Sequence, residues 1–320
     1  MPREKPISSD GLSRPPIRRY AGPIIDAHTH VGHVETARLL FEVAGRFGVG
    51  RLLGITRIEG IPALREAFPD RYRPILWVGH EGIGRPEAFA RQRVRQVRQA
   101  RRLGAVAGKF WYAPRFVAET HLVLDNPALG PVFETLEELG MAALVHVGDP
   151  DCWFERQYAD AARFGTKAEH YEPLERVLAS RPGLVVVGAH FGGDPEDLGH
   201  LRRLLRTYPN YFLDSSATKW IARELSVKPL ESRAFVIEHA DRIVFGSDLV
   251  AFEKAGPEDY ASRYWVHRWL WEGRGMKRSP IPDPCVLWPD GPRVHGLDLP
   301  DGVLAKVYHD NACRVFGLEP

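Results

Sequence analysis

Cysteine is scarce in this sequence of 320 residues, which contains only Cys152, Cys285 and Cys313. The three cysteines are far apart, and no two of them have the Cys-x-x-Cys spacing that is typical of zinc–thiolate sites and redox motifs. An odd number of widely spaced cysteines supports neither a disulfide framework nor a zinc–thiolate site. It favours a reducing compartment, and we therefore predict a cytoplasmic location.

Long apolar runs and an excess of one charge are also absent. No stretch approaches the roughly 20 apolar residues that a membrane-spanning helix requires, and the N-terminal residues lack the apolar core of a secretory signal. Lys and Arg total 43 against 41 for Asp and Glu. Because this balance is close to neutral, we expect neither nucleic acid nor a membrane surface among the partners.

The composition is otherwise that of a globular protein, 44% hydrophobic and 26% charged, which is enough for a sizeable core. Eight short apolar runs recur along the chain, at residues 23–27, 51–55, 74–78, 105–110, 141–145, 184–187, 211–214 and 242–245. Near-continuous apolar runs of this length are typical of parallel strands buried on both faces. Amphipathic segments that are typical of helices lie between several of them, at residues 88–103, 131–139, 173–180 and 195–205.

Eight such runs with intervening helices predict an α/β fold, the (β/α)₈ TIM barrel, as one domain over residues 21–320. A doubly wound open sheet is the alternative. It is disfavoured because no Gly-x-Gly-x-x-Gly turn follows the first run.

The two ends of the chain differ from this pattern. Residues 1–20 are proline-rich and basic, and we expect a flexible arm that is either disordered or laid across the barrel or a second subunit. Aromatic residues crowd an expected helix over 260–271, which would pack on the barrel or at a subunit interface, so a homo-oligomer is a candidate assembly. Residues 274–300 are expected to form a long proline-rich loop, and residues 303–316 a final amphipathic helix that closes the barrel.

Polar side chains end four of the eight runs. His28 and His30 end the first run, and residues two apart on a strand point to the same side, so both imidazoles can bind one ion. His146, His190 and Asp248 end the fifth, sixth and eighth runs. The C-terminal ends of barrel strands meet on one face. These histidines and the aspartate are therefore a sufficient ligand set for a zinc-class ion.

Three of these segments resemble one family. Asp-Ala-His-Thr-His at 26–30, Gly-Ala-His-Phe-Gly-Gly at 188–193 and Phe-Gly-Ser-Asp at 245–248 are similar to motifs of the amidohydrolase superfamily. The closest branch is the amidohydrolase-related (amidohydrolase 2) group. This group includes aminocarboxymuconate-semialdehyde decarboxylase, related nonoxidative decarboxylases, a pyrone-dicarboxylate lactonase and many hydrolases. The resemblance covers residues 24–316, and it implies a metal-dependent barrel enzyme without specifying the reaction.

The resemblance also implies a role for each polar residue. His28 and His30 match the metal ligands of the first strand, and His146 matches the ligand of the fifth. Asp248 matches the aspartate of the eighth strand, which binds the metal and handles the proton. His190 matches a histidine that serves as a second-site ligand or polarises the substrate.

Lys109 ends the fourth run, where some superfamily members have a carboxylated lysine that bridges two metals. The resemblance favours instead an unmodified Lys109 that pairs with a substrate carboxylate, and hence one metal ion. Asp26 has the parity of His28 and His30 but lies one layer deeper, so we expect it to support the ligands. Trp111 and His80 are expected in the wall of the substrate site, and Arg115 is expected to bind an acidic group of the substrate.

Two reactions fit this ligand set. A hydrolase would act on a cyclic amide, ester or lactone, with a zinc ion that lowers the pKa of its water toward about 7. Asp248 would accept the proton of that water and pass it to the leaving group, and His190 would polarise the carbonyl. The alternative is a metal-dependent nonoxidative decarboxylase of an aromatic or unsaturated carboxylic acid. In both, the partner is a small-molecule substrate with an acidic group.

Overall fold

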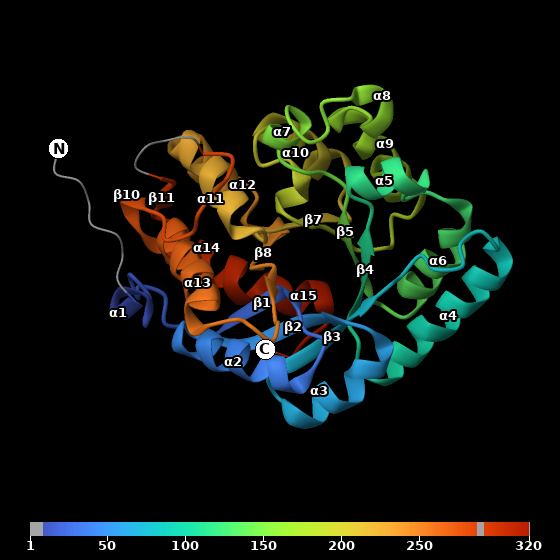
Figure 1. Ribbon diagram of the computed structural model, residues 1–320, viewed down its shortest axis with the longest axis horizontal. Helices are drawn as coiled ribbons and strands as arrows, with labels where there is room; N and C mark the ends of the chain where they lie inside the picture. Colours follow the sequence, from blue (N-terminus) through green and yellow to red (C-terminus); the bar gives the residue numbers. More distant parts are fainter. Residues whose placement is uncertain (1–8, 287–290, 320) are drawn as a thin grey trace.

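A computed structural model describes residues 9–286 and 291–319. Its main sheet has nine parallel strands in the order β8-β7-β6-β5-β4-β3-β2-β1-β9, and helices surround it (Figure 1). The strands are β1 (Ile24–His30), β2 (Val49–Thr56), β3 (Tyr72–Trp77), β4 (Ala107–Trp111), β5 (Ala142–His146), β6 (Val186–Gly188), β7 (Tyr211–Asp214), β8 (Ile243–Val244) and β9 (Leu249–Val250). All eight predicted runs overlap these strands, and the TIM-barrel prediction is confirmed.

The sheet closes through its last strand, which is broken into β8 and β9 at residues 245–248. β8 pairs with β7, and β9 pairs with β1. The amide of Ala27 donates to the carbonyl of Phe245 at 2.8 Å, which bridges β1 to the chain directly after β8. The first and last strands of the barrel are therefore joined on both sides of the break.

Helices cover the outside of the sheet. The longer ones are α2 (Val34–Arg46), α4 (Pro86–Arg102), α6 (Gly130–Glu138), α9 (Lys167–Ser180), α10 (Leu198–Thr207), α11 (Thr218–Val227), α12 (Pro229–Glu238) and α13 (Pro257–Glu272). Shorter ones are α1 (Ser9–Leu12), α3 (Ile61–Ala67), α5 (Pro114–Thr120), α7 (Asp151–Phe154), α8 (Ala161–Phe164), α14 (Asp301–Ala305) and α15 (Asn311–Phe316). The strands are largely apolar because one face meets these helices and the other fills the barrel.

The C-terminal segment seals one end of the barrel, as expected of a closing helix. Ala312, Val315 and Phe316 of α15 join the apolar side chains inside the barrel, among them Ile25 and Leu53. Asn311 fixes this segment by donating from Nδ2 to the carbonyls of Ala240 and Ile243.

The aromatic helix α13 packs on the barrel, between α2, α11 and β11 (Arg293–Leu297). Trp265 and Trp271 are buried. The expected loop over 274–300 is instead an antiparallel hairpin of β10 (Arg274–Arg278) with β11. The prolines that suggested a loop lie between the two strands, whereas Val294 and Leu297 of β11 are buried. Residues 287–290 of that connection lie outside the described residues.

Residues 1–8 of the expected arm lie outside the described residues. The remainder contacts α13: the amides of Arg19 and Tyr20 both donate to Glu272, at 2.9 and 3.0 Å. Leu12 is buried as well. Among the described residues, no helix has both the length and the apolar character needed to cross a membrane.

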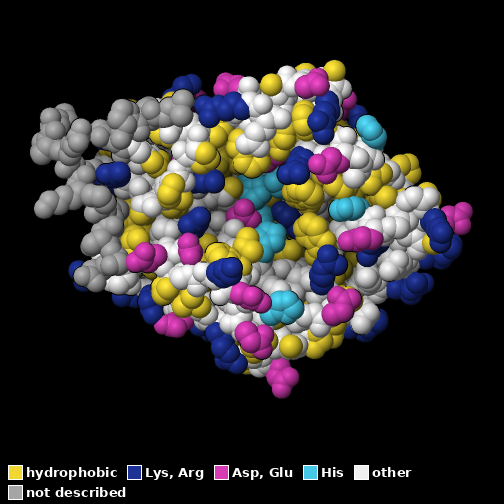
Figure 2. Space-filling view, in the orientation of Figure 1, with side chains coloured by type: hydrophobic (Ala, Val, Ile, Leu, Met, Phe, Trp, Pro, Cys, Tyr) yellow, Lys and Arg dark blue, Asp and Glu magenta, His cyan; other side chains and the backbone are white. Residues whose placement is uncertain are grey.

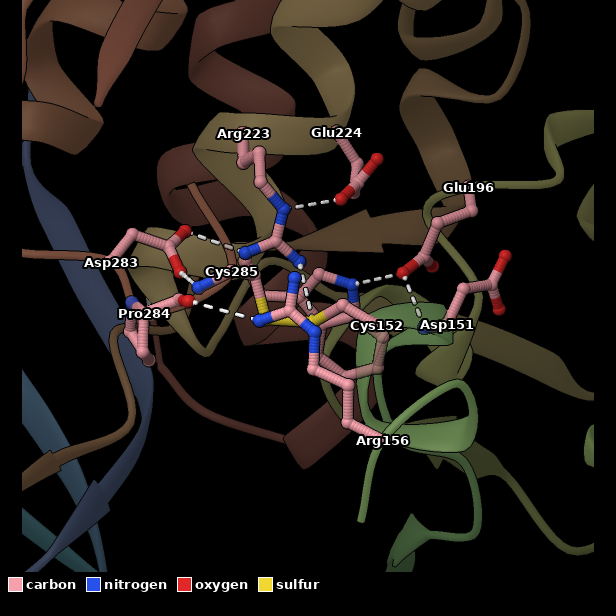
Figure 3. Close-up of a disulfide and its surroundings, with 10 residues drawn as sticks. Asp151, Cys152, Arg156, Glu196, Arg223, Glu224, Asp283, Pro284 and Cys285 are labelled. Carbon is pink, nitrogen blue, oxygen red and sulfur yellow. Dashed lines mark hydrogen bonds and ion pairs between the residues drawn. A yellow bond between two sulfur atoms is a disulfide. The ribbon is translucent and has the colours of Figure 1, made fainter. Parts of the chain in front are cut away.

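The expectation that no disulfide forms is wrong. Cys152 in α7 and Cys285 after β10 are bonded, with Cα atoms 6.1 Å apart and a separation of 133 positions in the sequence (Figure 3). That separation is within the normal range for a disulfide. Spacing in the sequence did not reveal the pair because the barrel brings two distant loops together. The inference of a reducing compartment, which depended on unpaired cysteines, loses its basis.

We predict that the purified, denatured but unreduced chain titrates one thiol, that of Cys313, and that it titrates three after reduction. Replacing both Cys152 and Cys285 with serine is expected to lower the free energy of unfolding by up to about 5 kcal/mol, because the bond closes a long loop in the unfolded chain. The measurements are a thiol assay and denaturant unfolding, with Cys313→Ser as the control. Three thiols without reduction would contradict the bond.

Candidate active site

A cavity of about 1160 Å³, the larger cavity, opens at the C-terminal ends of the first five strands. Its wall includes the last residues or near neighbours of these strands: His30, Thr56, Trp77, Trp111 and His146. Figure 2 shows histidine side chains gathered near the centre of one face of the molecule. Since strand ends of a barrel converge here, this is the position where barrel enzymes place their chemistry.

His28, His30 and Asp248 meet at the edge of this cavity. One carboxylate oxygen of Asp248 lies 3.3 Å from Nε2 of His28 and 3.2 Å from Nε2 of His30. The break in the last strand places the carboxylate there. Asp248 has a φ of 61°, and its amide donates to the carbonyl of His28 at 2.8 Å. The strained backbone of Asp248 is thus fixed directly to the strand that carries the two histidines.

Asp26 does not share the side of His28, contrary to the expectation from simple alternation. Between Asp26 and Thr29, β1 advances three residues while β2 advances two, from Leu52 to Gly54, so a β-bulge interrupts the alternation. Asp26 consequently accepts hydrogen bonds from the buried hydroxyl of Tyr264 on α13, at 2.9 Å, and from the amide of Ser247.

These hydrogen bonds place Asp26 between α13 and the segment of residues 245–248 that carries Asp248. Its carboxylate also accepts from the hydroxyl of Ser247 and the amide of His28. Burial raises the pKa of Asp26 to about 7, against the opposing effect of these donors. Asp26 therefore ties the broken strand to β1 and does not touch the imidazoles.

His28 is oriented by a buried carboxylate that the sequence did not single out. Nδ1 of His28 lies 2.7 Å from Asp214, at the end of β7, and both side chains are fully buried. Burial opposes ionisation of Asp214, but the imidazole beside it outweighs this and holds the pKa of Asp214 well below its ordinary value. An ionised Asp214 accepts the Nδ1 hydrogen, so Nε2 of His28 presents a lone pair to the cavity.

His190 is oriented by the same carboxylate through Ser216. The hydroxyl of Ser216 donates its single hydrogen to Asp214, so its oxygen accepts from Nδ1 of His190, 2.8 Å away. Burial, more than any neighbouring charge, lowers the pKa of His190 well below its ordinary value. His190 is therefore a neutral imidazole with its hydrogen on Nδ1 and a lone pair on Nε2.

A lone pair of His146 faces the lone pair on Nε2 of His190. Its Nε2 lies 3.1 Å from both the carbonyl of Gly148 and the carboxylate of Asp149, which are acceptors, so Nε2 carries the hydrogen. Nδ1 of His146 then faces Nε2 of His190 at 3.2 Å. Two acceptors at this distance repel unless a cation or a hydrogen-bond donor lies between them.

We refer to His28, His30, His146, His190 and Asp248 as the His–Asp cluster. Its donor set suits a divalent metal, because imidazole nitrogens and one carboxylate oxygen lie around a common space. The ligand atoms of His28, His30 and Asp248 lie within 4.8 Å of one another. His146 meets this group through His190.

Another acidic group, Asp151, Asp194 and Glu196, has an ammonium at its centre. The ammonium of Lys167 lies 2.7 to 3.2 Å from all three carboxylates. This group links α7, α9 and the loop after β6, and it offers no vacant place for a metal.

Lys109 lies on β4 with its side chain almost fully buried, and its amine is 3.4 Å from Nε2 of His28. Burial lowers the pKa of Lys109 to about 8, although the carboxylates of Asp214 and Asp248 act in the opposite direction. Lys109 lies beside the His–Asp cluster in the wall of the larger cavity.

The three other residues expected at the substrate site have different positions. His80 and Trp111 line the larger cavity, and both rings pack against Phe116. Arg115 lies on the outside of α5, 70% exposed, and pairs with Glu119 one turn away at 3.0 Å. It borders neither cavity of the His–Asp cluster. The i,i+4 spacing on a helix explains this pairing.

Sequence reasoning overlooked Asp214 and Ser216. A signal was present, because the seventh apolar run, like the runs that carry the His–Asp cluster, ends in a polar residue, Asp214. Only the register of neighbouring strands shows that this aspartate faces His28 rather than solvent.

The comparison with protein families agrees with this geometry. The family model described as Amidohydrolase matches residues 25–318. The chain belongs to the amidohydrolase family. This confirms the resemblance of its strand-end motifs. No curated protein matches the chain.

Solved structures similar to this amidohydrolase share its fold at low identity. A 2,6-dihydroxybenzoate decarboxylase from Rhizobium has a TM-score of 0.57 and 15% identity, covering 93% of this chain and 99% of that one. A 5-carboxyvanillate decarboxylase from Novosphingobium aromaticivorans, solved with manganese, gives 0.56 and 14%, covering 96% and 99%. A protein from Acinetobacter baumannii named as a probable 2-pyrone-4,6-dicarboxylic acid hydrolase gives 0.56 and 11%, covering 92% and 99%.

We predict that Asp214→Asn weakens binding of a divalent metal to this amidohydrolase by about 10- to 100-fold, because His28 loses the carboxylate that fixes its tautomer. The measurement is competition for the metal with a chelator of known affinity. Glu272→Gln is the matched control, since Glu272 is equally buried but contacts Tyr308 and Arg268. Equal affinities of the two variants would show that Asp214 does not orient a ligand.

Proposed function

We propose that this amidohydrolase is a metal-dependent nonoxidative decarboxylase of an aromatic or unsaturated carboxylic acid that carries a hydroxyl group. The observation that carries the proposal is the hydrogen-bonding state of His190. The ring hydrogen of His190 is on Nδ1, which donates a hydrogen bond to Ser216. The lone pair on Nε2 is therefore free to accept a hydrogen bond. A hydroxyl on the substrate can donate to that lone pair, whereas the carbonyl of a lactone or amide cannot.

The larger cavity supports a flat, acidic substrate. Trp77 and Trp111 are in its wall, and the amine of Lys109 faces it beside the His–Asp cluster. Aromatic side chains favour a planar ring, and a buried ammonium favours a carboxylate. Two of the similar structures are decarboxylases named for aromatic acids, which supports the same substrate class for this chain.

The proposed metal ligands are His28, His30, His146 and Asp248. A divalent metal held there would polarise the oxygen atoms of the bound acid. Zinc is the ion predicted from the ligand types, and manganese, present in one similar structure, is the principal competitor. Because an unmodified Lys109 cannot bridge two cations, we propose one metal ion per chain.

The proposed proton path uses Asp248. Burial opposes ionisation of Asp248, but the imidazoles around it hold its pKa well below the ordinary value, so the free site contains a carboxylate. Asp248 would take the proton of the substrate hydroxyl and return it to the carbon that loses carbon dioxide. The carbon–carbon bond breaks, its electron pair accepts that proton, and the product leaves as the phenolate. Lys109 would hold the carboxylate, and His190 would hold the hydroxyl hydrogen in a hydrogen bond until the proton passes to Asp248.

Hydrolysis of a cyclic amide, ester or lactone is the second candidate. One similar structure is named as a probable hydrolase of a pyrone dicarboxylic acid, and the same residues can activate water. The two reactions give different products, so a single panel separates them. We expect carbon dioxide from at least one hydroxybenzoate and no acid release from lactones. Acid release from a lactone without any carbon dioxide would favour the hydrolase.

We predict that Asp248→Asn lowers turnover by about 10² to 10⁴ and loses less metal than His30→Ala. The asparagine keeps the size and one oxygen donor but not the base, whereas alanine removes an imidazole ligand. Turnover on the identified substrate and metal content by elemental analysis are measured on the same samples. If Asp248→Asn turns over normally, the proposed proton path is wrong. If it loses metal as completely as His30→Ala, Asp248 is mainly a ligand.

A further inference from the structure

A second cavity of about 300 Å³, the smaller cavity, meets the His–Asp cluster from another side. It shares His146, His190 and Asp248 with the larger cavity. A substrate bound at the cluster can therefore extend into either cavity. The proposed reaction does not require the smaller cavity. The residues that line it therefore indicate what other group the substrate has.

One part of the wall of the smaller cavity is apolar and firmly held. Trp153, Trp220 and Ile281 line it. The disulfide of Cys152 with Cys285 (Figure 3) joins α7 to the segment after β10, and both segments contribute residues to the wall. Trp220 is fixed by its indole nitrogen, which donates to Glu196 at 2.8 Å. Such a slot is preorganised for a flat group, because little side-chain freedom remains to be lost on binding.

Among the described residues, two of the cations in this wall, Arg263 and Lys219, form no ion pair with a carboxylate. Arg223 is neutralised, with Glu224 and Asp283 each 2.5 Å from its guanidinium. Half-buried Arg263, in contrast, donates only to the carbonyl of Asp259 and the hydroxyl of Ser262, at 3.0 and 3.1 Å. Within residues 9–286 and 291–319, no carboxylate lies within ion-pair distance of Arg263 or of the exposed Lys219.

The nearby carboxylates cannot neutralise them from inside the cavity. Asp149 is engaged by His146 and by the hydroxyl of Tyr158, and Asp248 belongs to the His–Asp cluster. Removing part of a guanidinium from water without an ion-pair partner costs free energy, and an anionic ligand would offset that cost. The planar fork of arginine suits a carboxylate in particular.

We propose that the smaller cavity binds a second anionic group of the substrate, with Arg263 as its main partner and Lys219 at the mouth. This inference depends on the proposed function, since it assumes that the reacting carboxylate lies at the His–Asp cluster. It narrows the substrate class to acids that carry a second carboxylate or an equivalent anion on the same planar framework.

The test is a binding measurement without turnover. Benzoate and isophthalate (benzene-1,3-dicarboxylate), which lack the hydroxyl group, serve as probes, and their Kd values are measured by calorimetry on the metal-loaded protein. We expect isophthalate to bind more tightly than benzoate by about 10- to 100-fold, the usual effect of a hydrogen-bonded charged pair. Arg263→Gln should abolish that preference while changing the Kd of benzoate less than twofold.

Arg57→Gln is the matched control. Arg57 is an exposed arginine in the wall of the larger cavity, so this variant should keep the preference for isophthalate. Arg263→Lys should restore part of it, because the charge remains without the planar fork. Lys219→Gln, at an exposed position that folding does not depend on, should reduce the preference about two- to threefold and serves if Arg263→Gln does not fold.

Each outcome decides between the inferences. A preference lost in Arg57→Gln but kept in Arg263→Gln would place the second anion in the larger cavity and overturn the proposal. Equal binding of the two probes to the unmodified protein would overturn it as well. If the preference depends on Arg263 but no acid releases carbon dioxide, the anion subsite stands and the proposed decarboxylase function fails.

Discussion

The hydrogen bonds between β1 and the broken last strand support both the fold and the candidate site. The amide of Ala27 reaches Phe245 before the break, and the amide of Asp248 reaches His28 within it. A continuous strand would have closed the barrel equally well. The break turns one residue, Asp248, into the left-handed region, and that turn places a carboxylate between the two histidines of β1.

The other constraint is that the buried polar groups next to the imidazoles already have hydrogen-bond partners. Asp214 accepts from His28, from Ser216 and from the backbone of His190. The contacts with the His28 ring and with the Ser216 hydroxyl decide which nitrogen of His28 and of His190 carries hydrogen. The result is an array of acceptors at the cavity surface, which water alone satisfies poorly and a metal ion satisfies well. The buried polar groups thus favour a positively charged ligand at the site.

Much of this arrangement was predictable from the sequence. Eight apolar runs predicted the strands, because a parallel barrel buries both faces and leaves a continuous hydrophobic signal. The polar residues that end those runs, such as His30 and His146, predicted where the site lies. Asp26 was misplaced because a β-bulge, which depends on pairing with β2, leaves no mark in a single strand. The disulfide and the uncompensated charge of Arg263 were out of reach for a related reason: both depend on loops that only the folded barrel brings together.

The broken last strand has a consequence for how the protein is made. The residues of the candidate site are spread over 220 positions, from His28 to Asp248. At the usual synthesis rate, these positions take about 10 to 45 s to emerge from the ribosome. During that time β1 has an exposed edge and no partner for Ala27 or His28. One edge of β1 therefore stays unpaired for most of the synthesis of the chain and is free to pair with another strand. A product truncated before residue 245 would lack both the barrel closure and the carboxylate of the site.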